Sequence, residues 1–204
     1  MINQLKDVIV FENIPIHILD EASLMISKSL STTVSHSKPF IIHLCGIPGS
    51  GKSEYAKKLF PELLPGTYLL AFDTVMESLS GYQRDIKTLG VQQAFCNWES
   101  IARNIGYHIL EALIAEKRSI LFDHSASFTS HIDLLSLLIN YGYRVEMHQI
   151  ECPVKLADKR ILQREKIINR HTPSNYVVNR YDKLVDLIPQ YQQLVHKFKI
   201  IKGY

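Results

Sequence analysis

Short apolar runs alternate with longer helical segments along most of the chain. Continuous apolar runs rich in β-forming residues predict buried strands at Phe40–Cys45, Thr67–Phe72, Ser119–Phe122, Arg144–Glu151 and Lys199–Ile201. Segments with helical periodicity lie at 20–30, 51–59, 92–116, 131–140, 154–168 and 176–196. Strands that are separated by helices form right-handed crossovers within one sheet. The pattern therefore predicts an α/β fold, a doubly wound and mainly parallel sheet of about five strands with helices on both faces.

The beginning of the chain departs from this alternation. A polar run at 31–38 ends in Pro39 and is typical of a linker. We therefore expect residues 1–39 to form an N-terminal extension, either packed on the main domain or presented to a partner. The total length of 204 residues suits a single core, so residues 40–204 are expected to form one domain.

Composition excludes several classes of protein. The net charge is +3, with 23 basic against 20 acidic residues, which argues against a dedicated nucleic-acid partner. The three cysteines lie far apart, so neither a disulfide framework nor a zinc motif is indicated. No apolar run is long enough to cross a membrane, and no cleavable signal peptide is evident. We expect a cytoplasmic protein, although secretion without a cleavable signal would leave no trace in the sequence.

The first predicted strand runs directly into a phosphate-binding motif. The residues are Gly46-Ile47-Pro48-Gly49-Ser50-Gly51-Lys52-Ser53, a full match to G-x-x-x-x-G-K-[ST] between a strand and a helix. Glycines let backbone N–H groups approach phosphates, the lysine reaches the β and γ phosphates, and the serine hydroxyl holds Mg²⁺. The motif predicts binding of ATP with Mg²⁺. A guanine-specific N-K-x-D sequence is absent, which argues against a GTPase.

Two aspartates follow predicted strands. Asp73 comes after Phe72 and Asp123 comes after Phe122, so both are expected at the carboxyl edge of the sheet, where α/β proteins bind ligands. A carboxylate there can accept a proton from a hydroxyl or support Mg²⁺. The alternative for either residue alone is a helix N-cap. His124 is interpreted as structural, because no other histidine lies at ligand spacing in the sequence, and Phe95 and Trp98 are interpreted as core residues.

The basic residues concentrate near the end of the chain. Residues 155–204 carry eleven Lys or Arg against four Asp or Glu, whereas the preceding residues carry twelve against sixteen. Arg160 and Arg164 share a helix face, and a break at 169–174 would let Arg170 turn back toward them. The arrangement predicts a lid around residues 155–175 that closes over the triphosphate. The alternative is a solvated basic helix face.

Four blocks of the sequence resemble the zeta-toxin-like P-loop kinases, which include UDP-N-acetylglucosamine kinases. Residues 46–53 resemble their Walker A loop, 72–74 their Asp-Thr block, 121–127 their metal-supporting block and 164–173 their lid. The resemblance implies a P-loop kinase fold, with Asp73 as the catalytic base. Asp123 stands where the toxins commonly have Glu, and Ser127 stands where they have an acceptor-binding Arg, so the acceptor stays open.

The resulting hypothesis is a kinase that moves the γ-phosphate of ATP to a hydroxyl of a small metabolite, a nucleotide sugar or nucleotide-like molecule. Ser53 and Asp123 are predicted to hold Mg²⁺, and Lys52, Asp73, Arg164 and Arg170 to act in catalysis, with Arg160 as a further ATP contact. A nucleoside, dinucleotide or polynucleotide 5′-hydroxyl kinase is one alternative, and a non-catalytic ATP-binding module is another. A toxin role would imply an inhibitory protein partner.

Overall fold

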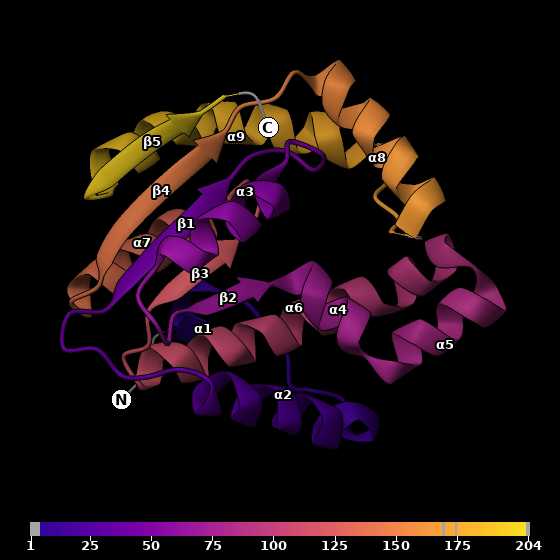
Figure 1. The fold of residues 1–204 in the computed structure, drawn as a ribbon, viewed down its shortest axis with the longest axis horizontal. Helices are drawn as coiled ribbons and strands as arrows, with labels where there is room; N and C mark the ends of the chain where they lie inside the picture. Colours follow the sequence, from indigo (N-terminus) through magenta and orange to yellow (C-terminus); the bar gives the residue numbers. More distant parts are fainter. Residues whose placement is uncertain (1–4, 169, 174, 203–204) are drawn as a thin grey trace.

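The computed structural model describes residues 5–168, 170–173 and 175–202 and contains a twisted five-stranded sheet (Figure 1). Its strands are β1 (Phe40–Cys45), β2 (Tyr68–Ala71), β3 (Ile120–Asp123), β4 (Arg144–Ile150) and β5 (Lys197–Ile201). They are ordered β2-β3-β1-β4-β5, and every neighbouring pair is parallel. The predicted doubly wound α/β fold is confirmed.

Helices surround the sheet and connect its strands. They are α1 (Leu5–Val8), η1 (Ile16–Ile18), α2 (Leu19–Ser31), α3 (Lys52–Leu59), η2 (Phe60–Glu62), α4 (Phe72–Ser78), α5 (Ser80–Leu89), α6 (Val91–Ala115), α7 (Ser130–Asn140), α8 (Val154–Ile168) and α9 (Asn175–Leu194). Of the predicted lid, Asn169 and Ser174 lie outside the described residues. None of the described helices is long and apolar enough to span a membrane.

The helices that were not predicted include α4 and α5, which pack against α6. The buried residues of α5 are Gly81, Tyr82 and Asp85, of which only Tyr82 is a large apolar side chain. A Cβ on Gly81 would lie 2.1 Å from the Trp98 ring, so only glycine fits this contact between α5 and α6. The indole nitrogen of Trp98 donates a hydrogen bond to Asp85 over 2.8 Å. Packing against α6 therefore stabilises α5 in addition to its own apolar spacing, which places Tyr82 and Ile86 on one face.

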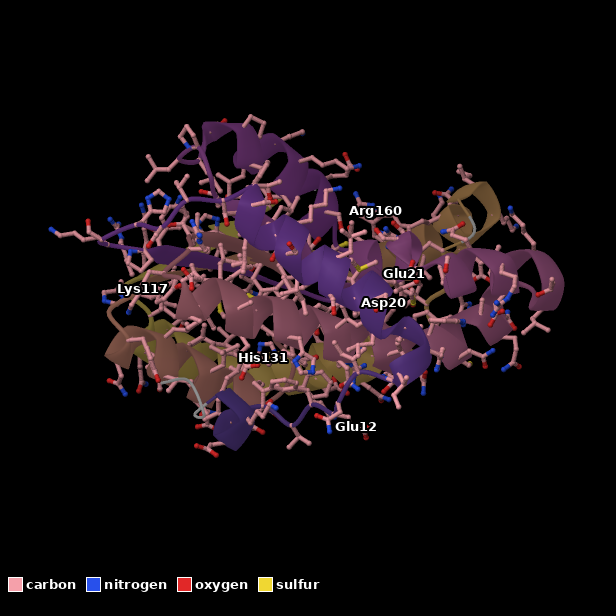
Figure 2. The ribbon with its side chains drawn as sticks, turned by 90° about the horizontal axis from the view of Figure 1, so that it is seen from below. Glu12, Asp20, Glu21, Lys117, His131 and Arg160 are labelled. Carbon is pink, nitrogen blue, oxygen red and sulfur yellow. The ribbon has the colours of Figure 1, made fainter. Side chains whose placement is uncertain are left out.

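The two faces of the sheet bury different side chains. Ile41 and Cys45 of β1 belong to a large core under α6, α7 and α9, whereas Ile42 and Leu44 face α3 on the other side. This alternation follows from the two-residue period of a strand. Side chains of α1 and α2 complete the larger core, and Figure 2 shows α2 crossing over α6.

The carboxyl ends of the three neighbouring strands β2, β3 and β1 lie side by side. Asp123, the last residue of β3, pairs with Leu44 of β1 and with Ala71 of β2. The loop that begins at Gly46 follows β1 directly. In one detail the prediction was wrong, because β2 ends at Ala71 and Asp73 lies in the first turn of α4. The helix begins early because the Phe72 ring packs on Tyr107 and Phe122.

Candidate active site

The loop from Gly46 to Ser53 wraps around the ammonium group of Lys52. Its Nζ donates to the carbonyl oxygens of Gly46 and Ile47 over 2.8 and 3.0 Å. Burial lowers the pKa of Lys52, and the charges of Asp123 and Asp73 oppose that effect. Gly49 and Gly51 have φ values of 77° and 100°, which favour glycine and let the backbone curl. The loop has the shape that backbone N–H groups need to surround a phosphate.

Ser53 and Asp123 form the second feature of the site. The Ser53 hydroxyl donates to Asp123 Oδ2 over 2.8 Å. Burial raises the pKa of Asp123, whereas the charge of Lys52 and the hydrogen bond from Ser53 lower it. Hydroxyl and carboxylate oxygens are ligands that Mg²⁺ prefers, so this partly buried pair fits that ion.

The three predicted lid arginines reach the site at different points. Arg160 Nη1 lies 3.5 Å from the carbonyl oxygen of Gly49, on the phosphate-binding loop. Arg164 donates to Thr172 Oγ1 over 2.6 Å, while its buried Nε has no partner among the described residues. Arg170 instead bonds Glu77 and lies 3.6 Å from Asp73. The nearby carboxylates of Asp73 and Glu77 raise the pKa of Arg170 against the effect of its burial.

One cavity of about 590 Å³ connects these groups. All predicted site residues line it except Gly46 and Ser50, and the set present is Pro48, Gly49, Gly51, Lys52, Ser53, Asp73, Asp123, Arg160, Arg164 and Arg170. The fold therefore brings together side chains from the phosphate-binding loop, α4, β3 and α8. How Arg160, Arg164 and Arg170 divide the ATP contacts stays a prediction.

Several residues of the same cavity were missed in the sequence. They are Glu77 on α4, Glu99 and Arg103 on α6, Phe128 before α7, and Tyr176 and Arg180 on α9. Arg103 forms an ion pair with Glu99. Arg180 lies four residues after Tyr176, so the shared helix face was a weak signal for this pair. The other residues come from separate helices and carry no common motif.

His124, which was interpreted as structural, lies beside two histidines that belong to other elements of the chain. His43, His124 and His131 are buried together, with ligand atoms within 4.8 Å of one another. The ring of His124 stacks on His131 at 4.3 Å between centroids and 4° between planes. His43 Nε2 lies 2.9 Å from His131 Nδ1, and His43 Nδ1 lies 2.8 Å from the Leu44 carbonyl oxygen.

These contacts describe a neutral hydrogen-bonded chain. Because Leu44 offers a carbonyl oxygen, His43 must donate from Nδ1 and accept at Nε2 from His131. Tyr107 Oη lies 3.3 Å from His131 Nε2 and continues the chain. Burial lowers the pKa of all three histidines, that of His43 to about 4. The backbone N–H of Ala126 donates to His124 Nδ1, so the cluster supports the loop after β3.

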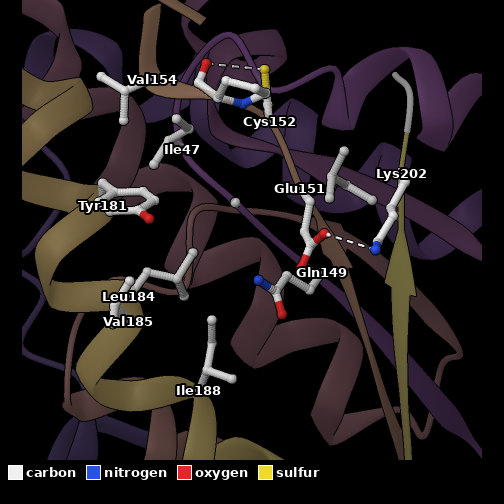
Figure 3. A pocket seen from close by; sticks show the side chains of 13 residues that line it. Ile47, Gln149, Glu151, Cys152, Val154, Tyr181, Leu184, Val185, Ile188 and Lys202 are labelled. Carbon is white, nitrogen blue, oxygen red and sulfur yellow. Dashed lines mark hydrogen bonds and ion pairs between the residues drawn. The ribbon is translucent and has the colours of Figure 1, made fainter.

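A second cavity, of about 470 Å³, lies on the other side of the phosphate-binding loop. Figure 3 shows its largely apolar wall, with Tyr181, Leu184 and Ile188 of α9 facing Ile47. Lys202 and Glu151 form an ion pair of 4.0 Å on the opposite wall. No residue lines both cavities.

Comparison with known protein families shows which family this chain matches. A family model described as an AAA domain matches residues 41–184. The chain belongs to the AAA domain family. The AAA domain match includes every predicted site residue from Gly46 to Arg170. It supports nucleotide binding on a P-loop fold. No curated protein matches the chain.

Solved structures share the fold of this AAA domain. The structure from the PezAT chromosomal toxin-antitoxin system of Streptococcus pneumoniae has a TM-score of 0.70 at 16% identity, over 90% of this chain and 76% of that chain. The AvrRxo1-ORF1:-ORF2 complex has a TM-score of 0.65 at 14% identity, over 98% and 72%. The same complex with ATP has a TM-score of 0.63 at 16% identity, over 91% and 63%.

Proposed function

We propose that this AAA domain protein is an ATP-dependent kinase. It would transfer the γ-phosphate to a hydroxyl of a small metabolite, a nucleotide sugar or nucleotide-like molecule. The observation that carries the proposal is the cavity shared by the phosphate-binding loop, the partly buried Ser53–Asp123 pair and the half-exposed carboxylate of Asp73. A kinase must hold ATP and the acceptor together, so the groups that bind the phosphates and the carboxylate that accepts the proton must line the same cavity.

The phosphate end is made by the loop and by α8. Lys52 holds the loop closed through two of its carbonyls and presents its charge where the β and γ phosphates would lie. Arg160 and Arg164 line the same end of the lid, and their guanidinium groups suit phosphate oxygens. The ATP complex of AvrRxo1-ORF1:-ORF2, which has the same fold, supports ATP as the donor.

The pair of Ser53 and Asp123 would hold Mg²⁺. When bound, the ion neutralises charge on the phosphate oxygens. Desolvation raises the pKa of Asp123, and the neighbouring charge of Lys52 opposes that effect and favours the carboxylate. Ser53 orients the Asp123 carboxylate through their 2.8 Å hydrogen bond.

Asp73 would accept the proton of the acceptor hydroxyl. In the transfer, the acceptor oxygen forms a bond to the γ-phosphorus, and the bond from that phosphorus to the bridging oxygen breaks. ADP leaves with the electron pair, and the hydroxyl proton passes to Asp73. Arg170, 3.6 Å from Asp73, fixes the position of this carboxylate before the acceptor binds.

Labelling of a metabolite extract tests the proposal. The protein is incubated with γ-labelled ATP, Mg²⁺ and a fractionated small-molecule extract, and labelled products are separated and identified. Transfer should fall about a hundredfold or more in Lys52→Ala and in Asp73→Asn. The matched controls are Lys87→Ala and Asp133→Asn, which replace exposed residues outside the cavity. Full transfer by both site variants, or ATP binding without any transfer by the natural chain, would contradict a kinase.

A partner protein forms a separate proposal. The PezAT structure comes from a toxin-antitoxin system, and the resemblance to zeta-toxin-like kinases points the same way. We therefore propose that an inhibitory protein binds this chain in the cytoplasm. Affinity capture of the tagged chain from its own source cells, followed by a transfer assay with and without the captured protein, tests this. A captured protein that leaves the transfer rate unchanged would contradict inhibition.

A further inference from the structure

Arg180 stands out among the cavity residues that the ATP chemistry does not use. It lies on α9, in the part of the wall that also contains Tyr176, Phe128 and the Glu99–Arg103 pair. This part of the wall combines aromatic rings with charged groups. ATP phosphates already have the loop, Lys52 and two lid arginines for their recognition.

The guanidinium of Arg180 is held in a fixed position. Its central carbon lies 4.5 Å from the centre of the Tyr176 ring and 5.7 Å from that of Phe128. Nη1 donates to the Ser125 hydroxyl over 3.0 Å. Ser125 is itself anchored, because its carbonyl oxygen accepts from the backbone N–H of Gly46 and its hydroxyl lies 3.0 Å from that of Ser127. A side chain fixed on three sides is preorganised for a ligand.

The positive charge of Arg180 is not matched by an ion pair. Among the described residues, no carboxylate oxygen lies within 4.0 Å of it, and its printed hydrogen bond goes to a neutral hydroxyl. Glu99 is the acidic residue with the largest electrostatic effect on Arg180, and it already pairs with Arg103. Burial and the charge of Arg103 both lower the pKa of Arg180. A partly buried guanidinium with five donors and no anionic partner among the described residues suits an incoming anion.

Arg180 also lies close to the reacting groups. It interacts electrostatically with Asp73, the proposed base, and with Lys52. An anion on Arg180 would therefore sit beside the accepting hydroxyl, and the rings of Tyr176 and Phe128 would contact the body of the same molecule. We infer that Arg180 is the specificity-determining residue for the acceptor, and that it binds an anionic group, a phosphate or a carboxylate, on that molecule. This inference rests on the proposed kinase function.

Separation of the small-molecule extract by anion-exchange chromatography tests whether the acceptor is negatively charged. A small-molecule extract is separated into fractions retained and not retained by an anion-exchange column at neutral pH. Each fraction is then incubated with γ-labelled ATP and the protein. Label should enter molecules of the retained fraction, and transfer into the unretained fraction alone would overturn the inference while leaving the kinase intact. Absence of transfer into both fractions would instead contradict the kinase.

Prior treatment of the retained fraction distinguishes the two anions. Alkaline phosphatase together with a pyrophosphatase removes acceptor activity if the anion is a phosphate. The activity survives this treatment if the anion is a carboxylate. Both results support an anionic acceptor.

Kinetics of Arg180 variants assign the contact to this residue. With the active retained fraction as the varied acceptor, Arg180→Met should lower kcat/KM for the acceptor about tenfold or more, while KM for ATP stays within about twofold. Arg180→Lys should recover part of the loss, because it restores the charge without the planar fork. Arg144→Met, at the opposite edge of the sheet, is the matched control. A loss confined to KM for ATP, or equal activity of Arg180→Met and the natural chain, would overturn the inference.

Discussion

At the scale of single residues, the site is defined by short polar contacts between distant parts of the chain. Ser53 and Asp123 are 70 residues apart in sequence, yet their oxygens lie 2.8 Å apart. Each was predicted from its own motif, and their contact supports the predicted roles. The position of Arg170 beside Asp73 and Glu77 could not be predicted, because the loop after α8 and the helix α4 are far apart in sequence. Sequence spacing gives the face of a helix but not the partner across a cavity.

Substitution of Ser53 tests the proposed metal pair. Ser53→Ala removes a hydroxyl ligand and frees the Asp123 carboxylate, so the Mg²⁺ concentration for half-maximal transfer should rise about tenfold or more. Ser53→Thr keeps the hydroxyl and should stay close to the natural chain. Initial rates over a Mg²⁺ titration measure both. An unchanged Mg²⁺ requirement in Ser53→Ala would remove Ser53 from the metal site.

At the scale of elements, α4 is positioned by its contact with α6. The Phe72 ring, one residue before Asp73, packs on the bare backbone of Gly106, where an added Cβ would lie 2.2 Å from the ring. The packing of Phe72 on α6 therefore places the proposed base. The sequence predicted the long helix α6 well, because its apolar stripe is continuous. It did not predict α4, which is short and depends on this tertiary contact.

A methyl group at position 106 tests this dependence. Gly106→Ala should force the Phe72 ring away and lower the free energy of unfolding by about 1 to 3 kcal/mol. Because α4 carries Asp73, kcat for transfer should also fall, with KM for ATP little changed. Denaturant titration and steady-state kinetics measure the two effects. Ser100→Ala, on the exposed side of the same helix, is the control. If the free energy of unfolding and kcat of Gly106→Ala equal those of the natural chain, α4 does not depend on this contact.

At the scale of the whole molecule, buried histidines make the free energy of unfolding depend on pH. His43, His124, His131 and His148 are buried, and desolvation lowers the pKa of each. For His43 the pKa falls from 6.5 to about 4. The unfolded chain therefore binds protons at a higher pH than the folded chain does. The stabilisation is complete above the unfolded pKa of 6.5 and is lost as pH falls toward about 4.

Acid titration of stability measures this linkage. Between about pH 7.5 and pH 5 the free energy of unfolding should fall by about 2 kcal/mol from His43 alone, with further loss from the other three histidines. Denaturant midpoints across this range give the slope. His17→Gln, which replaces an exposed histidine, should leave the slope unchanged. A midpoint that stays constant down to about pH 5 would contradict the neutral buried cluster.

The sequence by itself determined the order of strands and long helices along the chain, the phosphate-binding loop and the position of Asp123 at the carboxyl end of a strand. These features are local: strand and helix periods, and a motif whose residues are consecutive, depend on neighbouring positions. Only the tertiary structure decided that His43, His124 and His131 meet, that Arg170 lies beside Asp73, and that Arg180 faces the cavity without an acidic partner within ion-pair distance among the described residues. Such contacts join side chains from elements far apart in sequence, so they arise from packing rather than from any pattern along the chain.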